Sequence, residues 1–111
     1  RPEWLEATTH TWLRDNGFPR GIVHTTLGLT GALGGAALTF KTDEMAALRA
    51  RFGVAPEIGI GNTDSDAAAY AGQGVRSRFL YRFSGDLMGG TLVEDYNALA
   101  ASLRGLPALC L

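Results

Sequence analysis

Residues 57–70 constrain the fold more than any other stretch of the chain. Residues 57–60 are typical of a short buried strand, and residues 67–70 are typical of the beginning of a helix. The polar turn between them carries three oxygen-bearing side chains, Asn62, Asp64 and Asp66. In α/β proteins ligands bind at the carboxyl ends of strands, and oxygen side chains favour hard cations such as Mg²⁺. The stretch therefore predicts a strand–turn–helix unit with a magnesium site at the turn.

Helical and strand patterns alternate along the rest of the chain. Apolar residues recur at helical spacing in four segments, and runs rich in β-branched and aromatic residues mark three strands. The predicted helices cover residues 2–16, 42–52, about 65–71 and about 92–103. The predicted strands cover residues 22–26, 57–60 and 78–83, and the glycine-rich residues 27–37 are predicted to form a loop or an irregular crossing segment. Because helices and strands alternate, the expected fold class is α/β with parallel strands.

Length and composition limit the class of protein. With 111 residues, 46% of them hydrophobic, the chain is expected to form one domain whose modest core includes Trp4 and Trp12. A net charge of −1 without a basic run gives no support for nucleic-acid binding, and the lone Cys110 excludes an internal disulfide. The longest apolar run, residues 27–40, is short and broken by glycines, so no transmembrane segment is predicted. We expect a cytoplasmic protein, and peripheral contact with a membrane stays open.

Two known ligand-binding loops share part of the turn pattern. Asn62, Asp64 and Asp66 match the first, third and fifth positions of an EF-hand calcium loop, but alanine and glutamine replace its required glycine and final glutamate. Gly59 and Gly61 begin a dinucleotide-binding fingerprint, but its third glycine position holds Asp64, whose carboxylate would repel a pyrophosphate. The EF-hand therefore fails, and the dinucleotide fingerprint is a poor match.

A purely structural interpretation of the turn stays open. Asp64 or Ser65 would cap the helix that follows, and such acids need no ligand. Lys41 stands immediately before the predicted helix 42–52, and its spacing alone is that of a solvated lysine. The glycine-rich segment lacks the Gly-Lys-Ser/Thr that would complete a P-loop, which excludes that motif. The three oxygen ligands and the upstream lysine together favour a phosphate-and-magnesium site.

Several segments carry a family resemblance in the right order. Residues 61–70 match the pattern Gly-Asn-x-x-x-Asp-x-x-x-Tyr, and Phe40-Lys41 precede a helix upstream of it. Residues 12–21 read Trp-Leu-Arg-Asp-Asn-Gly-Phe-Pro-Arg-Gly, and Gly74-Val75 lead to the strand 78–83 and Gly85. Together they resemble the haloacid-dehalogenase superfamily from the segment after its second motif to the end of the domain. The most similar branch is the lipin type, which includes phosphatidate phosphatases and the domain that ends some phosphatidylinositol-transfer proteins.

The resemblance implies a fold and an activity. The fold would be the C-terminal half of a Rossmann-like three-layer domain with a parallel sheet, in a magnesium-dependent phosphatase acting on a phosphomonoester such as phosphatidate. Lys41 would steady the nucleophile and the transferred phosphoryl group, whose negative charge a cation offsets. Asn62 would ligate Mg²⁺, and Asp66 would support the metal site from behind its direct ligands. The peripheral residues of the site would be Thr63, Asp64 and Ser65.

The chain differs from the family in one respect that leaves two functions open. The nucleophile of the superfamily, the first aspartate of Asp-x-Asp-x-Thr, belongs upstream of Arg1, as does the second-motif Ser or Thr. Residues 64–66 have the Asp-x-Asp spacing but already belong to the Gly-Asn-x-x-x-Asp-x-x-x-Tyr pattern, which resembles the fourth motif of the superfamily. The chain is therefore expected to be inactive alone, as the C-terminal half of a phosphatase or as a non-catalytic phosphatidate-binding or regulatory module. An unrelated α/β domain is the third alternative.

The missing segment also predicts an incomplete sheet. In the family, the nucleophile strand lies between the second-motif strand and the strand matched by residues 57–60, and both would precede Arg1. Residues 22–26 would then flank one side of the gap, and residues 57–60 and 78–83 the other. We therefore expect that the missing N-terminal half, or another chain, completes the sheet, because unpaired strand edges are normally avoided.

Overall fold

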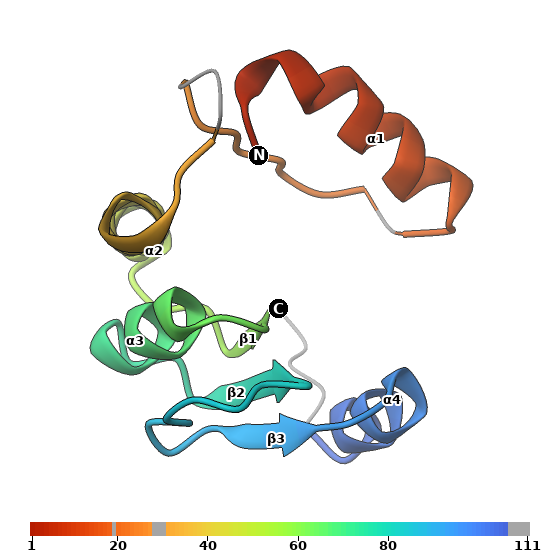
Figure 1. The fold of residues 1–111 in the computed structure, drawn as a ribbon, viewed down its shortest axis with the longest axis vertical. Coiled ribbons are helices and arrows are strands. Elements are labelled where there is room, and N and C mark those ends of the chain that lie inside the picture. Colours follow the sequence, from red (N-terminus) through yellow and green to blue (C-terminus); the bar gives the residue numbers. More distant parts are fainter. Residues whose placement is uncertain (19, 28–30, 107–111) are drawn as a thin grey trace. The chain divides into compact units, whose positions relative to one another are not determined.

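The computed structural model describes residues 1–18, 20–27 and 31–106. The chain divides into two compact units, Arg1–Phe40 and Lys41–Leu111. Its helices are η1 (Glu3–Leu5), α1 (Glu6–Asp15), α2 (Gly34–Phe52), α3 (Asp64–Gly72) and α4 (Tyr96–Arg104). Its strands are β1 (Ile58–Gly61), β2 (Ser77–Tyr81) and β3 (Thr91–Val93), as Figure 1 shows.

The first unit contains the helix predicted over residues 2–16. One 3-10 turn, η1, continues directly into α1. The N–H of Glu3 donates to the C=O of Thr26 at 2.7 Å, and the N–H of Thr26 donates to the C=O of Arg1 at 2.8 Å. These two bonds form an isolated parallel bridge between Pro2 and Thr26. The strand predicted over residues 22–26 is wrong, because only Thr26 of that segment pairs with another part of the described chain.

The expected burial of the two tryptophans is also wrong. Trp4 is 67% exposed and Trp12 is 54% exposed. The ring of Trp12 contacts the ring of Phe18, with 5.5 Å between their centroids, but Phe18 is itself exposed. Helix α1 has no buried residue. Its apolar positions follow a helical period without lying in a core.

Helix α2 begins earlier than predicted. The sequence placed its start at residue 42 and made residues 27–37 a loop, but the helix covers Gly34–Phe52. The loop prediction is therefore wrong from Gly34 onward. Alanine and leucine, both strong helix formers, follow the two glycines of the first turn and extend the helix back to them. Lys41 consequently lies inside the helix and not before it.

The second unit contains a three-stranded parallel sheet in the order β1–β2–β3. Gly61 is opposite Leu80, and Tyr81 is opposite Val93, which fixes the register at the carboxyl ends of the strands. The expected α/β class with parallel strands is confirmed. Both strands predicted for this unit are confirmed, with their ends shifted by one or two residues.

The third strand was not predicted. The sequence assigned the chain from Leu92 onward to the last helix, but Leu92 lies in β3 and the helix begins after it, at α4. The chain passes from β2 to β3 through residues 82–90, fewer than the dozen or so that a parallel connection usually needs. Arg82 and Met88 adopt positive φ angles of 46° and 47° in this connection, which tightens its path. A three-residue strand that follows another strand after so short a connection has no distinctive sequence pattern of its own.

Different helices cover the two faces of the sheet. Helix α3 packs on β1 and β2, and α4 packs on β3. Phe79, Val93 and Leu99 form a buried cluster on the α4 side, extended by the partly buried Leu103 and Leu106. Leu80, on the other side of the central strand, is fully buried. The core of this unit is therefore centred on β2.

Among the described residues, no strand pairs with the outer edge of β1, which is the first strand in the sheet order (Figure 1). The N–H of Ser77 in β2 donates to the C=O of Glu57 at 2.9 Å, so the backbone groups of Ile58 and Ile60 point away from β2. Of these groups, only the C=O of Ile60 has a partner among the described residues, the hydroxyl of Tyr70 at 2.8 Å. The side chains of Ile58 and Ile60 are 42% and 47% exposed. A further strand would pair with unpaired backbone N–H and C=O groups of this kind.

Candidate functional site

The predicted turn lies between β1 and α3, at the carboxyl edge of the sheet. Thr63 is the N-cap of α3 and has an extended conformation, with φ −131° and ψ 162°. Its side chain accepts from the N–H of Asp66, and the carboxylate of Asp66 accepts from the N–H of Thr63, which together form a capping box. The cap is therefore Thr63, and the prediction of Asp64 or Ser65 is wrong. The Thr-x-x-Asp spacing is the sequence signal that identifies it.

Lys41 reaches this turn from within α2. Its Nζ lies 2.6 Å from Oδ1 of Asp66, and it donates to Oγ of Ser65 at 2.8 Å and to Oγ1 of Thr63 at 3.4 Å. An ammonium group has three N–H donors, so these three contacts engage all of them. We call Lys41, Thr63, Ser65 and Asp66 the lysine clamp. The fold thus brings the upstream lysine to the acidic turn, but its donors are already used there.

The carboxylate of Asp66 is saturated as well. Its Oδ2 accepts from the N–H of Asn62 at 3.0 Å, from the N–H of Thr63 at 3.1 Å and from the hydroxyl of Thr63 at 2.8 Å. The residue is only 6% exposed. Burial raises the pKa of Asp66, but the hydrogen bonds from Lys41, Asn62 and Thr63 outweigh burial and hold the pKa below its ordinary value. Asp66 is therefore a buried, ionised residue that fixes the turn.

The other two predicted oxygen ligands have exposed side chains. Asn62 lies directly after β1, and no described residue forms a hydrogen bond with its side-chain amide. The carboxylate of Asp64 lies against Gly85 in the β2–β3 connection and leaves no space for a Cβ there. Of the three predicted oxygen residues, Asn62 and Asp64 have exposed side chains, and Asn62 is the one that directly follows β1.

The described residues fit a magnesium site only in part. Mg²⁺ prefers octahedral oxygen coordination, usually with one or two carboxylates, water and substrate phosphate. Asn62 offers one amide oxygen, whereas both oxygens of Asp66 are engaged by the lysine clamp and the turn. Among the described residues, no group of three or more His, Cys, Asp or Glu side chains could hold a metal ion. A magnesium site at Asn62 would therefore draw any carboxylate from the exposed Asp64 or from another segment.

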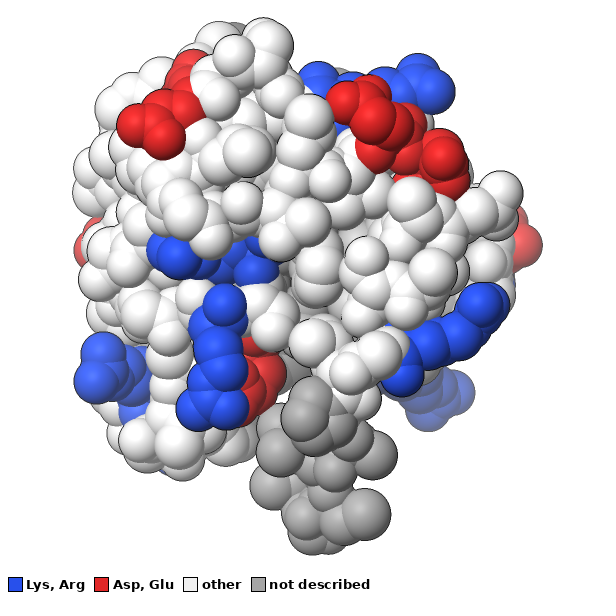
Figure 2. All heavy atoms as spheres, turned by 90° about the horizontal axis from the view of Figure 1, so that it is seen from below, with Lys and Arg blue, Asp and Glu red and all other residues white. Residues whose placement is uncertain are grey.

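No protein-family model, curated protein or solved structure matches the chain. The resemblance to the haloacid-dehalogenase superfamily accordingly rests on the motifs and their order. Over residues 1–18, 20–27 and 31–106, no helix has the length and apolar character needed to cross a membrane. On the face drawn in Figure 2, Lys and Arg side chains lie among uncharged and acidic residues and do not form one continuous patch.

Two glycines of β1 let α3 lie close to the strand. A Cβ at Gly59 would lie 2.7 Å from the ring of Tyr70, and a Cβ at Gly61 would overlap the carboxyl group of Asp66. Burial, and then the negative charge of Asp66, raise the pKa of Tyr70 to about 12, so its hydroxyl stays protonated and donates to Ile60. The Gly-x-Gly pattern that begins a dinucleotide fingerprint therefore serves the packing of α3.

Replacing Gly61 with alanine is expected to displace Asp66 and lower the free energy of unfolding by about 1–3 kcal/mol, the usual cost of overpacking. Urea denaturation followed by circular dichroism measures this loss. The matched control is Gly72→Ala in the last turn of α3, where an added Cβ meets nothing within 4 Å. The control should be neutral or slightly stabilising, because alanine is the better helix former. Equal losses in both variants would contradict the close approach at Gly61.

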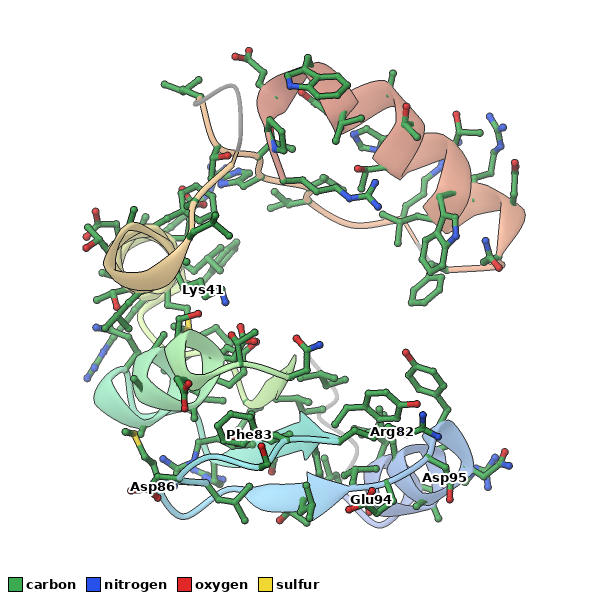
Figure 3. The ribbon with its side chains drawn as sticks, in the orientation of Figure 1. Lys41, Arg82, Phe83, Asp86, Glu94 and Asp95 are labelled. Atoms are coloured by element: carbon green, nitrogen blue, oxygen red, sulfur yellow. The ribbon has the colours of Figure 1, made fainter. Side chains whose placement is uncertain are left out.

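A second group of side chains at the same edge was not predicted. The rings of Tyr81 and Tyr96 stack with centroids 4.7 Å apart and an interplanar angle of 10°. The guanidinium carbon of Arg82 lies 5.3 Å from the centre of the Tyr81 ring. Figure 3 shows Arg82 near Glu94 and Asp95, which follow β3. The sequence missed this group because β3 was assigned to a helix; recognising that strand would have placed residues 94 and 95 at the carboxyl edge.

Proposed function

We propose that the chain is the C-terminal half of a magnesium-dependent phosphatase with the haloacid-dehalogenase fold, acting on a phosphomonoester such as phosphatidate. The observation that carries this proposal is the turn after β1. There the lysine clamp holds the Gly-Asn-x-x-x-Asp sequence in one conformation and leaves Asn62 open at the carboxyl edge. Ligands of parallel α/β sheets bind at this edge. Lys41 and the acidic turn are 22 or more residues apart in sequence yet in direct contact, which supports the resemblance.

The residues of this chain would orient ligands and would not attack the substrate. Asp66 and Lys41 fix the turn, so that the amide of Asn62 is held at the strand end. Magnesium bound with the help of Asn62 would offset the negative charge of the phosphoryl oxygens. Lys41 could contact a phosphoryl group only by giving up a hydrogen bond to Ser65 or Thr63, because its three donors are engaged.

The nucleophile would come from a strand outside residues 1–111. Parallel sheets are normally covered on both faces, and their inner strands are paired on both sides. The outward-facing backbone groups of Ile58 and the N–H of Ile60 suit a further strand beside β1, although Tyr70 already bonds the C=O of Ile60. A carboxylate at the carboxyl end of that strand would lie next to Asn62. This arrangement would supply both the nucleophile and the missing magnesium ligand.

The test is phosphate release by a polypeptide extended before Arg1, with phosphatidate in detergent micelles and para-nitrophenyl phosphate as substrates. We expect magnesium-dependent turnover, and at least about 10-fold lower kcat for Asn62→Ala, as is usual when a metal's ligand environment is disturbed. The control is Asn97→Ala, an exposed asparagine on α4, which should leave kcat unchanged. The 111-residue chain alone should give no turnover, because covalent catalysis needs the nucleophile. Turnover by the 111 residues that is abolished in Asp64→Ala would refute this assignment and make Asp64 the nucleophile.

One observation favours a non-catalytic alternative, which the family resemblance makes a phosphatidate-binding or regulatory module. Every donor of Lys41 and both oxygens of Asp66 are engaged, which is the state expected of a purely structural clamp. A binding module would associate with phosphatidate-containing vesicles and release no phosphate from them. Vesicle sedimentation beside the phosphate assay separates the two functions, because only the phosphatase would consume the lipid.

A further inference from the structure

In the lysine clamp, the ammonium group of Lys41 is already bonded to the turn, so the site needs another positively charged side chain to bind a phosphate group. Phosphate groups are bound by donors that carry positive charge, and charge-assisted hydrogen bonds are the strong ones. Lys41 has no donor left for a ligand in this arrangement. At the same edge of the sheet, Arg82 directly follows β2 and is exposed. It therefore merits comparison with Lys41 as a ligand-binding cation.

Arg82 is held in place by three contacts. Its N–H donates to the C=O of Val93 at 2.8 Å, and its Nε donates to the C=O of Glu94 at 2.9 Å. Its guanidinium lies against the ring of Tyr81, which stacks on Tyr96. Its φ of 46° is unusual for a residue other than glycine, and such strain persists only where neighbouring contacts maintain it. The guanidinium is therefore positioned before any ligand arrives.

The strand register places Arg82 at the same end of the sheet as the turn of the candidate site, one strand away from it, and its guanidinium is directed toward Glu94 after β3. Gly61 in β1 is opposite Leu80 in β2. Thr63 follows Gly61 by two residues, and Arg82 follows Leu80 by two residues. The two neighbouring strands therefore end at the same level, and Arg82 emerges from the strand next to the one that carries Asn62.

The terminal nitrogens of Arg82 are available to a ligand. Arginine has five N–H donors in a planar fork that matches phosphate and carboxylate oxygens. Only the Nε donor forms a hydrogen bond with the described residues. The nearby carboxylates do not neutralise it: neither Glu94 nor Asp95 forms an ion pair with Arg82 among the described residues, and Asp95 accepts from the N–H of Ala98 at 2.8 Å. Figure 3 shows Asp86, in the middle of the β2–β3 connection, well away from Arg82.

We propose that Arg82 binds oxygens of an anionic group of the substrate at the carboxyl edge of the sheet, and so determines specificity for phosphorylated ligands. This rests on the proposed function, which makes the ligand a phosphomonoester. Arg82 would bind the anion directly through its terminal nitrogens, whereas Lys41 holds the turn. The role needs the planar fork as well as the charge, so lysine at this position should replace it only in part.

The test is titration with inorganic phosphate at low ionic strength, followed by isothermal calorimetry and two-dimensional NMR on the 111-residue chain and on the polypeptide extended before Arg1. Loss of a charge-assisted hydrogen-bonding pair predicts a dissociation constant about 10-fold higher or more in Arg82→Gln. Arg82→Lys should give a smaller increase. The matched control is Arg51→Gln, because Arg51 also lies over an aromatic ring, that of Phe52, but in the last turn of α2. The control should bind phosphate as the unchanged protein does.

Each outcome separates this inference from the proposed function. Weaker phosphate binding in Arg82→Gln, with a folded NMR spectrum and no phosphatase turnover in the extended polypeptide, would support the Arg82 site and overturn the phosphatase. Magnesium-dependent turnover with unchanged phosphate binding in Arg82→Gln would support the phosphatase and overturn the Arg82 site. No binding of phosphate by the unchanged protein, or equal weakening in Arg51→Gln, would overturn the role of Arg82.

Discussion

Replacing Asp66 with asparagine is expected to lower the free energy of unfolding by about 1–3 kcal/mol, the usual cost of removing one partner from a hydrogen-bonded group that is partly buried. The substitution leaves the ammonium of Lys41, whose side chain is 29% exposed, without its counter-charge. It also replaces a carboxylate that accepts from the N–H groups of Asn62 and Thr63 by a weaker acceptor. Urea denaturation at neutral pH measures the loss.

The matched control for this experiment is Asp64→Asn. Asp64 lies in the same first turn of α3, but its side chain is exposed and outside the lysine clamp. Exposed substitutions of this kind usually change stability by no more than about 0.5 kcal/mol. A similar loss in both variants would show that general charge at the start of α3 matters and that the clamp does not.

The free energy of unfolding is also expected to depend on pH through Asp66. The pKa of Asp66 is lower in the folded protein than its ordinary value, so folding is favoured once the carboxyl group is ionised. That contribution is fully present above about pH 4, the ordinary range of an aspartate, and is lost as pH falls through the lower folded pKa. The unchanged protein should therefore lose more stability than Asp66→Asn between neutral and strongly acidic pH.

The strand–turn–helix unit was predictable because each part is encoded locally. The apolar residues of β1, the polar turn and the alanines of α3 follow one another without interruption. The cap was misassigned because Asp64 and Ser65, which directly follow Thr63, are also common N-cap residues. The contact of Lys41 with Asp66 has no local signal, since the two residues are on different helices. The resemblance to a family supplied that proximity.

The wrong predictions of secondary structure occur where tertiary contacts override the local sequence pattern. Residues 22–26 are rich in β-branched side chains, yet a strand needs a neighbour, and only Thr26 finds one among the described residues. The short β3 runs into the helical pattern of α4, so its separate identity depends on pairing with β2. Arg82 could not be selected as a site residue for the same reason: its partners, Val93 and Glu94, were expected in a helix.

Amide hydrogen exchange along β1 of the 111-residue chain is expected to alternate from residue to residue. The parallel register directs the N–H groups of Gly59 and Gly61 to β2, whereas those of Ile58 and Ile60 face the open edge. Exchange of the inner amides requires the sheet to open, but the outer amides already contact water. The outer amides should exchange at least about 100-fold faster, as measured by two-dimensional NMR in deuterated buffer.

Extending the polypeptide before Arg1 should remove this alternation if the added segment contributes the missing strand. Ile58 and Ile60 would then slow at least about 100-fold, while Gly59 and Gly61, which already have partners, would change little. Strong protection of Ile58 and Ile60 in the 111-residue chain itself would contradict an open edge. Protection that rises with protein concentration would mean that two copies pair through β1, because an unpaired edge is a template for another chain. Protection independent of concentration would mean that another segment of the same chain pairs with β1. The outer edge of β1 would then not be free to pair with the proposed nucleophile strand.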